Sequence, residues 1–402
     1  MVFDFLQPIS TSVEEYISKL SNQTLGKKVV FHTQTDFPVL DNIAIAIITV
    51  NEFRGSEKDN DDFSFDYFRK QFYSLFPGNW NASIVDLGTI EAGASIEDTY
   101  FVVKSLVAEL IKKRIIPVVI GGSQDLTYPM YRAYDNLDQM VNLVSVDNQF
   151  DFSKENKLDS ESYLSKIIVE EPNNLFNFSN LGFQTYFNSQ EEIDLIEKLY
   201  FEAYRLGEVS NNITVAEPVF RDADLVSIDM NSVQSSYSGN FEEFNPNGFT
   251  GKEICALARY AGISDKVTSF GIFNFNPNGN EVVLTAQMLW YFIEGFCFRS
   301  NEYPFGTKEN YIKKRNNKNS LIAGFMPAKQ YTKTLLGFSP SDFSVTSAID
   351  EAMKHSVAKR GRRLTDRQKQ HIKQQAQLLI SSNVSMREAA KLLNVDRQTL
   401  QK

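Results

Sequence analysis

The stretch "VVIGGSQD", residues 118–125, places a short apolar run directly before two glycines and a polar cluster. We interpret the apolar run as a buried strand and the glycines as a tight turn into a following helix. The stretch lacks the lysine and the longer glycine spacing of a phosphate-binding loop. Asp125 is expected to cap the helix that follows the turn. A strand, a turn and a helix in this order predict one unit of an α/β fold.

The same alternation continues through residues 1–300. Strands are expected at 43–50, 83–87, 115–120, 143–146, 182–186, 225–229 and 267–273. Helices are expected between them, at 98–114, 189–207, 251–262 and 284–296. This order predicts right-handed crossovers and a mostly parallel sheet that helices cover on both faces. In such folds the chemistry is expected at the carboxyl ends of the strands.

The composition limits the classes of function. The chain has 402 residues, 42% of them hydrophobic, which is enough for one large domain and an appendage. It has two cysteines and three histidines, which argues against a disulfide framework and leaves few residues for a catalytic triad. No apolar run approaches the roughly 18 residues that a membrane span needs. We therefore expect a cytoplasmic protein with no membrane partner.

The net charge of -9 conceals two regions of opposite sign. Residues 351–402 carry 12 basic and 4 acidic side chains, a balance of 12 - 4 = +8. The rest of the chain carries the other 29 basic and 46 acidic side chains, a balance of -17. This asymmetry predicts a polyanionic partner for the C-terminal region.

Two further strand ends also carry polar clusters, "VSVDNQFD" at residues 144–151 and "VSIDMNS" at residues 226–232. With "VVIGGSQD", they resemble the motifs of the ureohydrolase superfamily, which comprises arginases, agmatinases and formimidoylglutamases. There the motifs are Gly-Gly-Asp-His, Asp-x-His-x-Asp and Ser-x-Asp-x-Asp. The resemblance covers residues 1–300 and points to the formimidoylglutamase-like branch of Bacteroidetes, through "GGSQDLTYPMYRAYD" and "TAQMLWYFIEG". It implies an arginase-like, three-layer α/β/α domain.

The resemblance also implies a metal site, because members of that superfamily bind two Mn²⁺ ions that activate a hydroxide against an amidine or guanidine carbon. Three aspartates retain ligand positions: Asp147, Asp151 and Asp229. Three neutral amides occupy the others, Gln124 and Gln149 for histidines and Asn231 for an aspartate. Asn274 replaces a glutamate on the next strand and is our candidate for a substrate contact.

These replacements weaken the expected centre. Two divalent ions bring four positive charges, and three ionised aspartates offset about three of them. The loss of both imidazoles also removes the ligands that favour manganese over magnesium or calcium. We therefore expect no metal or one weakly bound hard cation, with the amides and carboxylates hydrogen-bonded to one another. An active, metal-dependent amidine hydrolase remains the alternative.

Residues 351–402 form a separate candidate module. Capping boxes at Thr365–Gln368 and Ser385–Glu388 predict helix starts, and a third helix is expected after Asn394. The segment resembles the helix-turn-helix of serine recombinases. That likeness implies contacts with the minor and then the major groove of DNA by Arg360, Arg362 and Arg363, and by Arg397, Gln398 and Thr399. Plain solvated helices are the alternative.

Together these observations predict three regions: an arginase-like α/β domain at 1–300, an irregular linker at 301–350 and a basic helical module at 351–402. The leading hypothesis is a formimidoylglutamase-like protein with a degenerate metal site and a small amidine-like ligand. DNA binding through the C-terminal region is a third hypothesis. It requires paired modules, so we expect a homo-oligomer.

Overall fold

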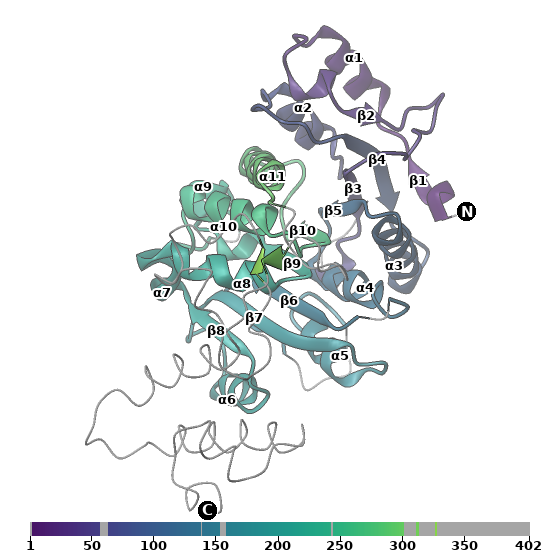
Figure 1. The fold of residues 1–402 in the computed structure, drawn as a ribbon. Helices are drawn as coiled ribbons and strands as arrows, with labels where there is room; N and C mark the ends of the chain where they lie inside the picture. The colour runs from purple at the N-terminus through teal and green to yellow at the C-terminus, as the bar shows by residue number, and fades with distance from the viewer. Residues whose placement is uncertain are drawn as a thin grey trace, which may run out of the picture. The chain divides into compact units, whose positions relative to one another are not determined.

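The computed structural model describes residues 2–56, 63–137, 139–152, 158–242 and 244–300, and two short strands beyond them (Figure 1). The chain divides into two units, Met1–Arg299 and Ser300–Lys402. In the second unit the described strands are β11 (Tyr311–Ile312) and β12 (Met326–Pro327), which pair antiparallel. The predicted helix-turn-helix, with its six DNA-facing residues, lies outside the described residues.

A ten-stranded sheet forms the centre of the first unit. Its order is β1 (Leu6–Gln7), β4 (Ile84–Glu91), β3 (Ile45–Asn51), β5 (Ile116–Ile120), β10 (Ser269–Phe273), β9 (Leu225–Asp229), β6 (Val141–Val146), β7 (Leu175–Phe183) and β8 (Glu202–Arg205). β2 (Val30–Phe31) also pairs with β4. All neighbouring strands are parallel except β1 and β4. The predicted mostly parallel sheet is therefore confirmed.

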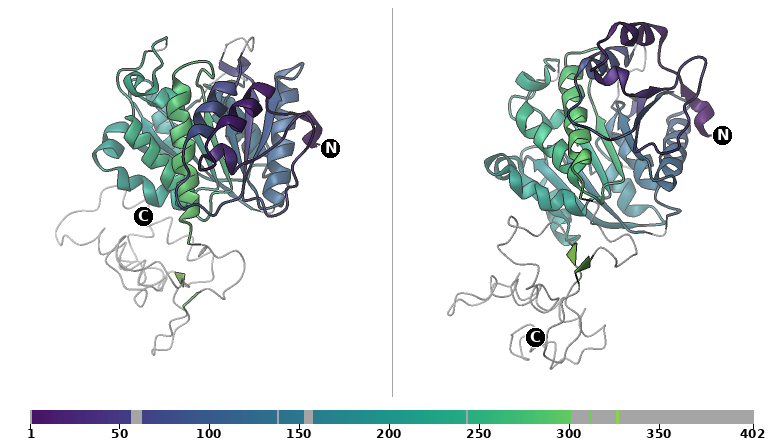
Figure 2. Two further views of the ribbon diagram at one scale, coloured as in Figure 1. Left: turned by 90° about the horizontal axis from the view of Figure 1, so that it is seen from above. Right: turned by 45° about the horizontal axis from the view of Figure 1, so that its top comes forward.

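Helices cover both faces of this sheet (Figures 1 and 2). One face carries α1 (Thr11–Lys19), α2 (Asp66–Ser74), α7 (Leu206–Asn211), α8 (Ala216–Asp222), α10 (Gly251–Ile263) and α11 (Glu281–Cys297). The other carries α3 (Ile96–Lys112), α4 (Thr127–Arg132), α5 (Tyr163–Val169) and α6 (Gln190–Lys198). The shorter helices are η1 (Val2–Phe5), η2 (Leu25–Lys27), η3 (Arg54–Ser56), η4 (Gln124–Leu126), η5 (Ile213–Val215), η6 (Met230–Ser232) and α9 (Ser235–Ser238). Among the described residues, no helix combines the length and apolarity that crossing a bilayer requires.

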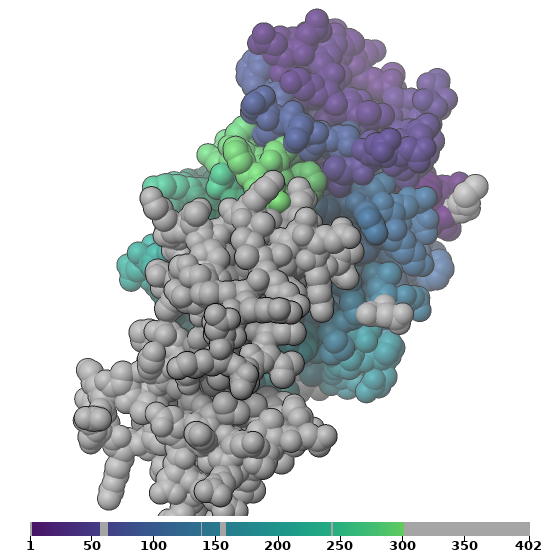
Figure 3. Space-filling model, viewed as in Figure 1, coloured from purple at the N-terminus to yellow at the C-terminus, as the bar shows by residue number. Residues whose placement is uncertain are grey.

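Strand β3 shows why the sheet needs two helical layers. All seven of its residues are buried. Ile45 and Ile47 pack into one hydrophobic core, while Ala46 and Ile48 pack into the other. Successive side chains of a strand point to opposite faces, so an unbroken apolar run requires a cover on each side. In Figure 3 the N-terminal α1 and α2, in purple and blue, lie together at one end of this unit.

Two of the expected elements are wrong. The helix expected at 189–207 ends at Lys198, because Tyr200 adopts a left-handed φ of 61° and β8 then pairs with β7. Of the strand expected at 182–186, only Gly182 and Phe183 lie in a strand, where they end β7, which begins at Leu175. Polar residues in β7, such as Asn177 and Ser179, interrupt the apolar pattern by which a strand is recognised in the sequence. The pairing of β7 with both β6 and β8 offsets the low strand propensity of such residues.

A buried ion pair joins α2 to the sheet. Arg69 Nε lies 2.8 Å from Asp86 Oδ2, and Arg69 also donates to Thr49 Oγ1 at 3.0 Å. Asp86 accepts further hydrogen bonds from the Tyr73 hydroxyl and, at 2.8 Å, from the backbone N–H of Gly88. Both charged side chains are almost wholly buried. Such a pair holds its geometry because every charge has a partner.

We predict that Asp86→Ala lowers the free energy of unfolding by about 3–5 kcal/mol, because Arg69 would keep a buried charge without its counter-ion. Urea unfolding followed by circular dichroism measures this loss. Asp194→Ala, at an exposed position of α6, serves as the control and should change the free energy by less than about 0.5 kcal/mol. A loss below about 1 kcal/mol for Asp86→Ala would contradict the role of the pair.

Candidate functional site

Four neighbouring strands end at one edge of the sheet, in the order β5, β10, β9 and β6. Because these strands are parallel, their carboxyl ends meet, and the structure brings together the residues that follow them. After β5 the chain turns through Gly121 and Gly122, with φ of 90° and 78°, and enters η4. A Cβ on Gly122 would lie 2.3 Å from Leu126 Cδ1, so the turn requires glycine there. The predicted tight turn is confirmed.

Gln124, the first residue of η4, is fully buried and points at the first aspartate. Its Nε2 donates to Asp147 Oδ2 at 2.6 Å and lies 3.3 Å from both Ser145 Oγ and the Tyr163 hydroxyl. Its Oε1 has no hydrogen-bond partner among the described residues. The side chain that stands at a histidine position thus presents a proton to the carboxylate, where a metal ligand would present a lone pair.

Asp147 and Asp151 form a hydrogen-bonded pair of buried carboxyl groups. The second oxygen of Asp147, Oδ1, accepts from the backbone N–H of Gln149 at 2.9 Å. Burial raises the pKa of Asp147 to about 6, against the lowering effect of these hydrogen bonds. Burial, with the negative charges of Asp147 and Asp229, holds the pKa of Asp151 well above its usual value. The pair therefore retains a proton near neutral pH.

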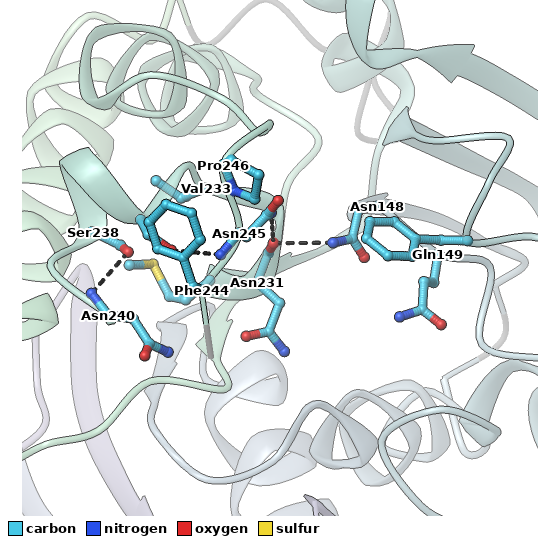
Figure 4. A pocket seen from close by; sticks show the side chains of 12 residues that line it. Asn148, Gln149, Asn231, Val233, Ser238, Asn240, Phe244, Asn245 and Pro246 are labelled. Carbon is cyan, nitrogen blue, oxygen red and sulfur yellow. Dashed lines mark hydrogen bonds between the residues drawn. The ribbon is translucent and has the colours of Figure 1, made fainter. Parts of the chain in front are cut away.

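Asp229 ends β9 and caps η6, where its Oδ1 accepts from the backbone N–H of Asn231 at 2.8 Å. The side-chain amides of Asn231 and Gln149 have no hydrogen-bond partner within the described part of the chain. Both instead line a pocket of about 330 Å³. Figure 4 shows them beside Asn148 and the segment after α9. Two of the three amides at predicted ligand positions therefore face the pocket.

Asn274 follows β10 in a left-handed conformation, with φ of 58°. Its Oδ1 accepts from the backbone N–H of Gln124 at 3.1 Å, and its own N–H donates to the Gly122 carbonyl at 2.9 Å. Asn274 thus fastens the end of β10 to the turn after β5. Its role as a substrate contact stays a prediction.

The expectation that Asp125 caps a helix is wrong. The residue that precedes η4 is Ser123, and Asp125 lies inside η4, fully buried. Its carboxylate accepts a hydrogen bond from the Tyr100 hydroxyl of α3. Burial raises the pKa of Asp125 to about 6. The Asp125 side chain is therefore directed toward α3.

Comparison with known proteins matches residues 47–295 to the model of the arginase family. The chain belongs to the arginase family. The predicted superfamily is thereby confirmed, while the resemblance to the Bacteroidetes branch stays a prediction. No curated protein matches the chain.

Solved structures of arginase-family proteins share this fold. A Trypanosoma cruzi formiminoglutamase with Mn²⁺ is 18% identical with a TM-score of 0.58, covering 66% of this chain and 97% of that one. The formimidoylglutamase of Bacillus subtilis is 14% identical with a TM-score of 0.61, covering 72% and 100%. The agmatine ureohydrolase of Thermoplasma volcanium is 19% identical with a TM-score of 0.53, covering 73% and 100%. At these identities the likeness establishes the fold and nothing finer.

Two residues of this arginase-family site were not singled out from the sequence. Tyr163 begins α5, is almost wholly buried, and its hydroxyl lies 3.4 Å from Ser145 Oγ. Burial and the nearby negative charges of Asp151 and Asp147 raise the pKa of Tyr163 well above its usual value, so its hydroxyl keeps its proton. Ser145 points to the same cluster from within β6. A single tyrosine that follows a loop, and a serine within a strand, are too common in sequences to indicate a functional site.

We predict that Asp151→Asn raises the midpoint of thermal unfolding at pH 7.5 by at least about 2 °C, the shift that ~1 kcal/mol produces in a large domain. The raised pKa means that the folded chain binds this proton more tightly than the unfolded chain. Stability is therefore lost as the pH rises above the unfolded pKa of about 4, and asparagine avoids that loss while still donating to Asp147.

Thermal unfolding of the metal-free protein at pH 4 and pH 7.5 tests this, with the exposed Asp194→Asn as the control. The gain should be present at pH 7.5 and small at pH 4. A destabilised Asp151→Asn variant at pH 7.5 would show that the carboxyl pair does not share a proton.

Proposed function

We propose that this arginase-family protein is non-hydrolytic and binds a small molecule at the strand ends without a dinuclear manganese centre. The observation that carries the proposal is the 2.6 Å hydrogen bond from Gln124 Nε2 to Asp147 Oδ2. With the Gln149 N–H on the other oxygen, both oxygens of Asp147 have a donor. These donors occupy lone pairs that bridging metal ions would need.

Charge supports the same conclusion. The shared proton of Asp147 and Asp151 leaves the three aspartates with less than three negative charges near neutral pH. Two divalent ions would bring four positive charges into a buried site, and unbalanced charge there is costly. Among the described residues, no group of three or more acidic, histidine or cysteine side chains has the arrangement of a metal site. The residues present therefore do not fit the centre that manganese-bound members of the fold contain.

The alternative is an amidine hydrolase that uses a single metal cation other than manganese. Its support is the grouping of the three aspartates, since Asp147 and Asp229 each raise the pKa of Asp151 through their charge. An all-oxygen set of this kind suits Mg²⁺ or Ca²⁺ better than manganese. The two free cysteines, Cys255 and Cys297, agree with a reducing, cytoplasmic setting for either function.

We predict that the purified protein, incubated with Mn²⁺ and desalted, retains less than one ion per chain by elemental analysis. The triple variant Gln124→His, Gln149→His, Asn231→Asp should gain up to two, because it restores two imidazoles and one carboxylate. Gln190→His, at an exposed position of α6, controls for adventitious binding by a new histidine.

Two ions held tightly by the unaltered chain, with release of urea, ammonia or formamide from an amidine, would overturn the non-hydrolytic proposal. A triple variant that gains no metal would remove the support for treating these positions as former ligands.

A second function, DNA binding, rests on the charge of residues 351–402, with 12 basic against 4 acidic side chains. We predict retention on a DNA column that weakens steeply between about 50 and 200 mM salt, as counter-ion release requires. Deletion of residues 358–402 should abolish it. Retention by the truncated chain would assign the binding to another surface.

A further inference from the structure

The pocket beside the three aspartates is lined by twelve described residues, and none of them is charged. Five carry side-chain amides: Asn148, Gln149, Asn231, Asn240 and Asn245. Its volume of about 330 Å³ is near the lower limit for pockets that hold small ligands, roughly 300–1,000 Å³. A pocket with this lining selects its ligand by hydrogen bonds and shape, because no described side chain on its wall can form an ion pair.

The amide groups of Gln149 and Asn231 are available to a ligand, whereas that of Asn148 is buried. Asn148 is only 5% exposed, and its Nδ2 donates to the Asn231 carbonyl at 3.0 Å. Its Oδ1 is buried and has no partner in the described part of the chain. Gln149 and Asn231 add two amides without partners among the described residues. Amides without protein partners in a pocket wall can donate to and accept from a ligand.

The amides also approach from different sides. Figure 4 shows Asn148 and Gln149, which follow β6, across the pocket from Asn240, which follows α9, with Asn231 of η6 between them. A flat base with one polar edge would satisfy only part of this arrangement. A ring that carries hydroxyl groups around its circumference matches it, because each hydroxyl donates and accepts as each amide does.

Aromatic rings complete the lining. Phe187 and Phe244 both line the pocket, yet they are 45% and 64% exposed. The exposed faces of such rings suit the C–H face of a sugar ring. A cation such as an amidine would lose part of its hydration here without a direct ion pair to any described residue of the lining.

We propose that this pocket binds a neutral carbohydrate of monosaccharide size, with Gln149 and Asn231 as polar contacts and Phe187 or Phe244 against the ring. The inference rests on the proposed function, because Gln149 and Asn231 can contact a ligand only while they hold no metal.

Saturation-transfer NMR and calorimetry on the full chain, with EDTA present, test the inference. The neutral probes are glucose, galactose, mannose and N-acetylglucosamine, and the comparison probes are agmatine and adenosine. We expect at least one sugar to bind with a Kd at or below about 1 mM, and agmatine and adenosine to bind at least about tenfold more weakly. Gln149→Leu with Asn231→Leu should weaken sugar binding at least about tenfold, the effect of losing two hydrogen bonds.

Two further variants keep the test decisive. Phe244→Ala, at an exposed site, should weaken sugar binding without affecting folding, whereas Gln190→Leu on α6 should leave it unchanged. Binding of adenosine or agmatine in preference to every sugar would overturn the inference, as would the absence of sugar binding at 10-fold the expected Kd. If no sugar binds and the protein also lacks manganese, only the carbohydrate inference fails. Two tightly bound Mn²⁺ ions would instead contradict the proposed function.

Discussion

The burial of three carboxyl groups at one edge of a parallel sheet is the constraint that the rest of the site satisfies. A buried carboxylate needs donors, a counter-charge or a proton. This chain supplies an amide from Gln124, backbone N–H groups after Asp147 and Asp229, and a proton shared with Asp151. These neutral donors and the shared proton satisfy the buried carboxyl groups at the strand ends.

The three substituted positions divide into two kinds. The Gln124 side chain points inward, where it hydrogen-bonds to Asp147 and Ser145 in the interior of the site. Gln149 and Asn231 turn outward and line the pocket. The amides at this centre therefore form two groups: an inner one that is hydrogen-bonded to the carboxylates, and an outer one whose side chains face the pocket. The first supports the loss of hydrolysis, and the second supports a new ligand class.

Another buried carboxylate of the same domain, that of Asp86, is neutralised in a different way. Asp86 receives a full counter-charge from Arg69 and a hydroxyl from Tyr73, and it lies between α2 and the sheet, away from the pocket. At the strand ends no described arginine or lysine forms an ion pair with Asp147 or Asp151. A permanent ion pair fixes packing, whereas carboxyls held by amides and a proton remain responsive to pH and to bound ions.

The alternation of apolar runs with helical patterns determined the parallel sheet, because period and length are local properties of the chain. The motif order likewise determined the family and the cluster of Gln124, Asp147 and Asp229. It did not determine the end of α6 at Lys198 or the strand β8, since a left-handed Tyr200 and pairing with β7 decide these. Nor did it reveal Tyr163, or the outward orientation of Gln149 and Asn231. Those features depend on which segments meet in space, and only tertiary packing brings residues 145, 163 and 231 to one edge of the sheet.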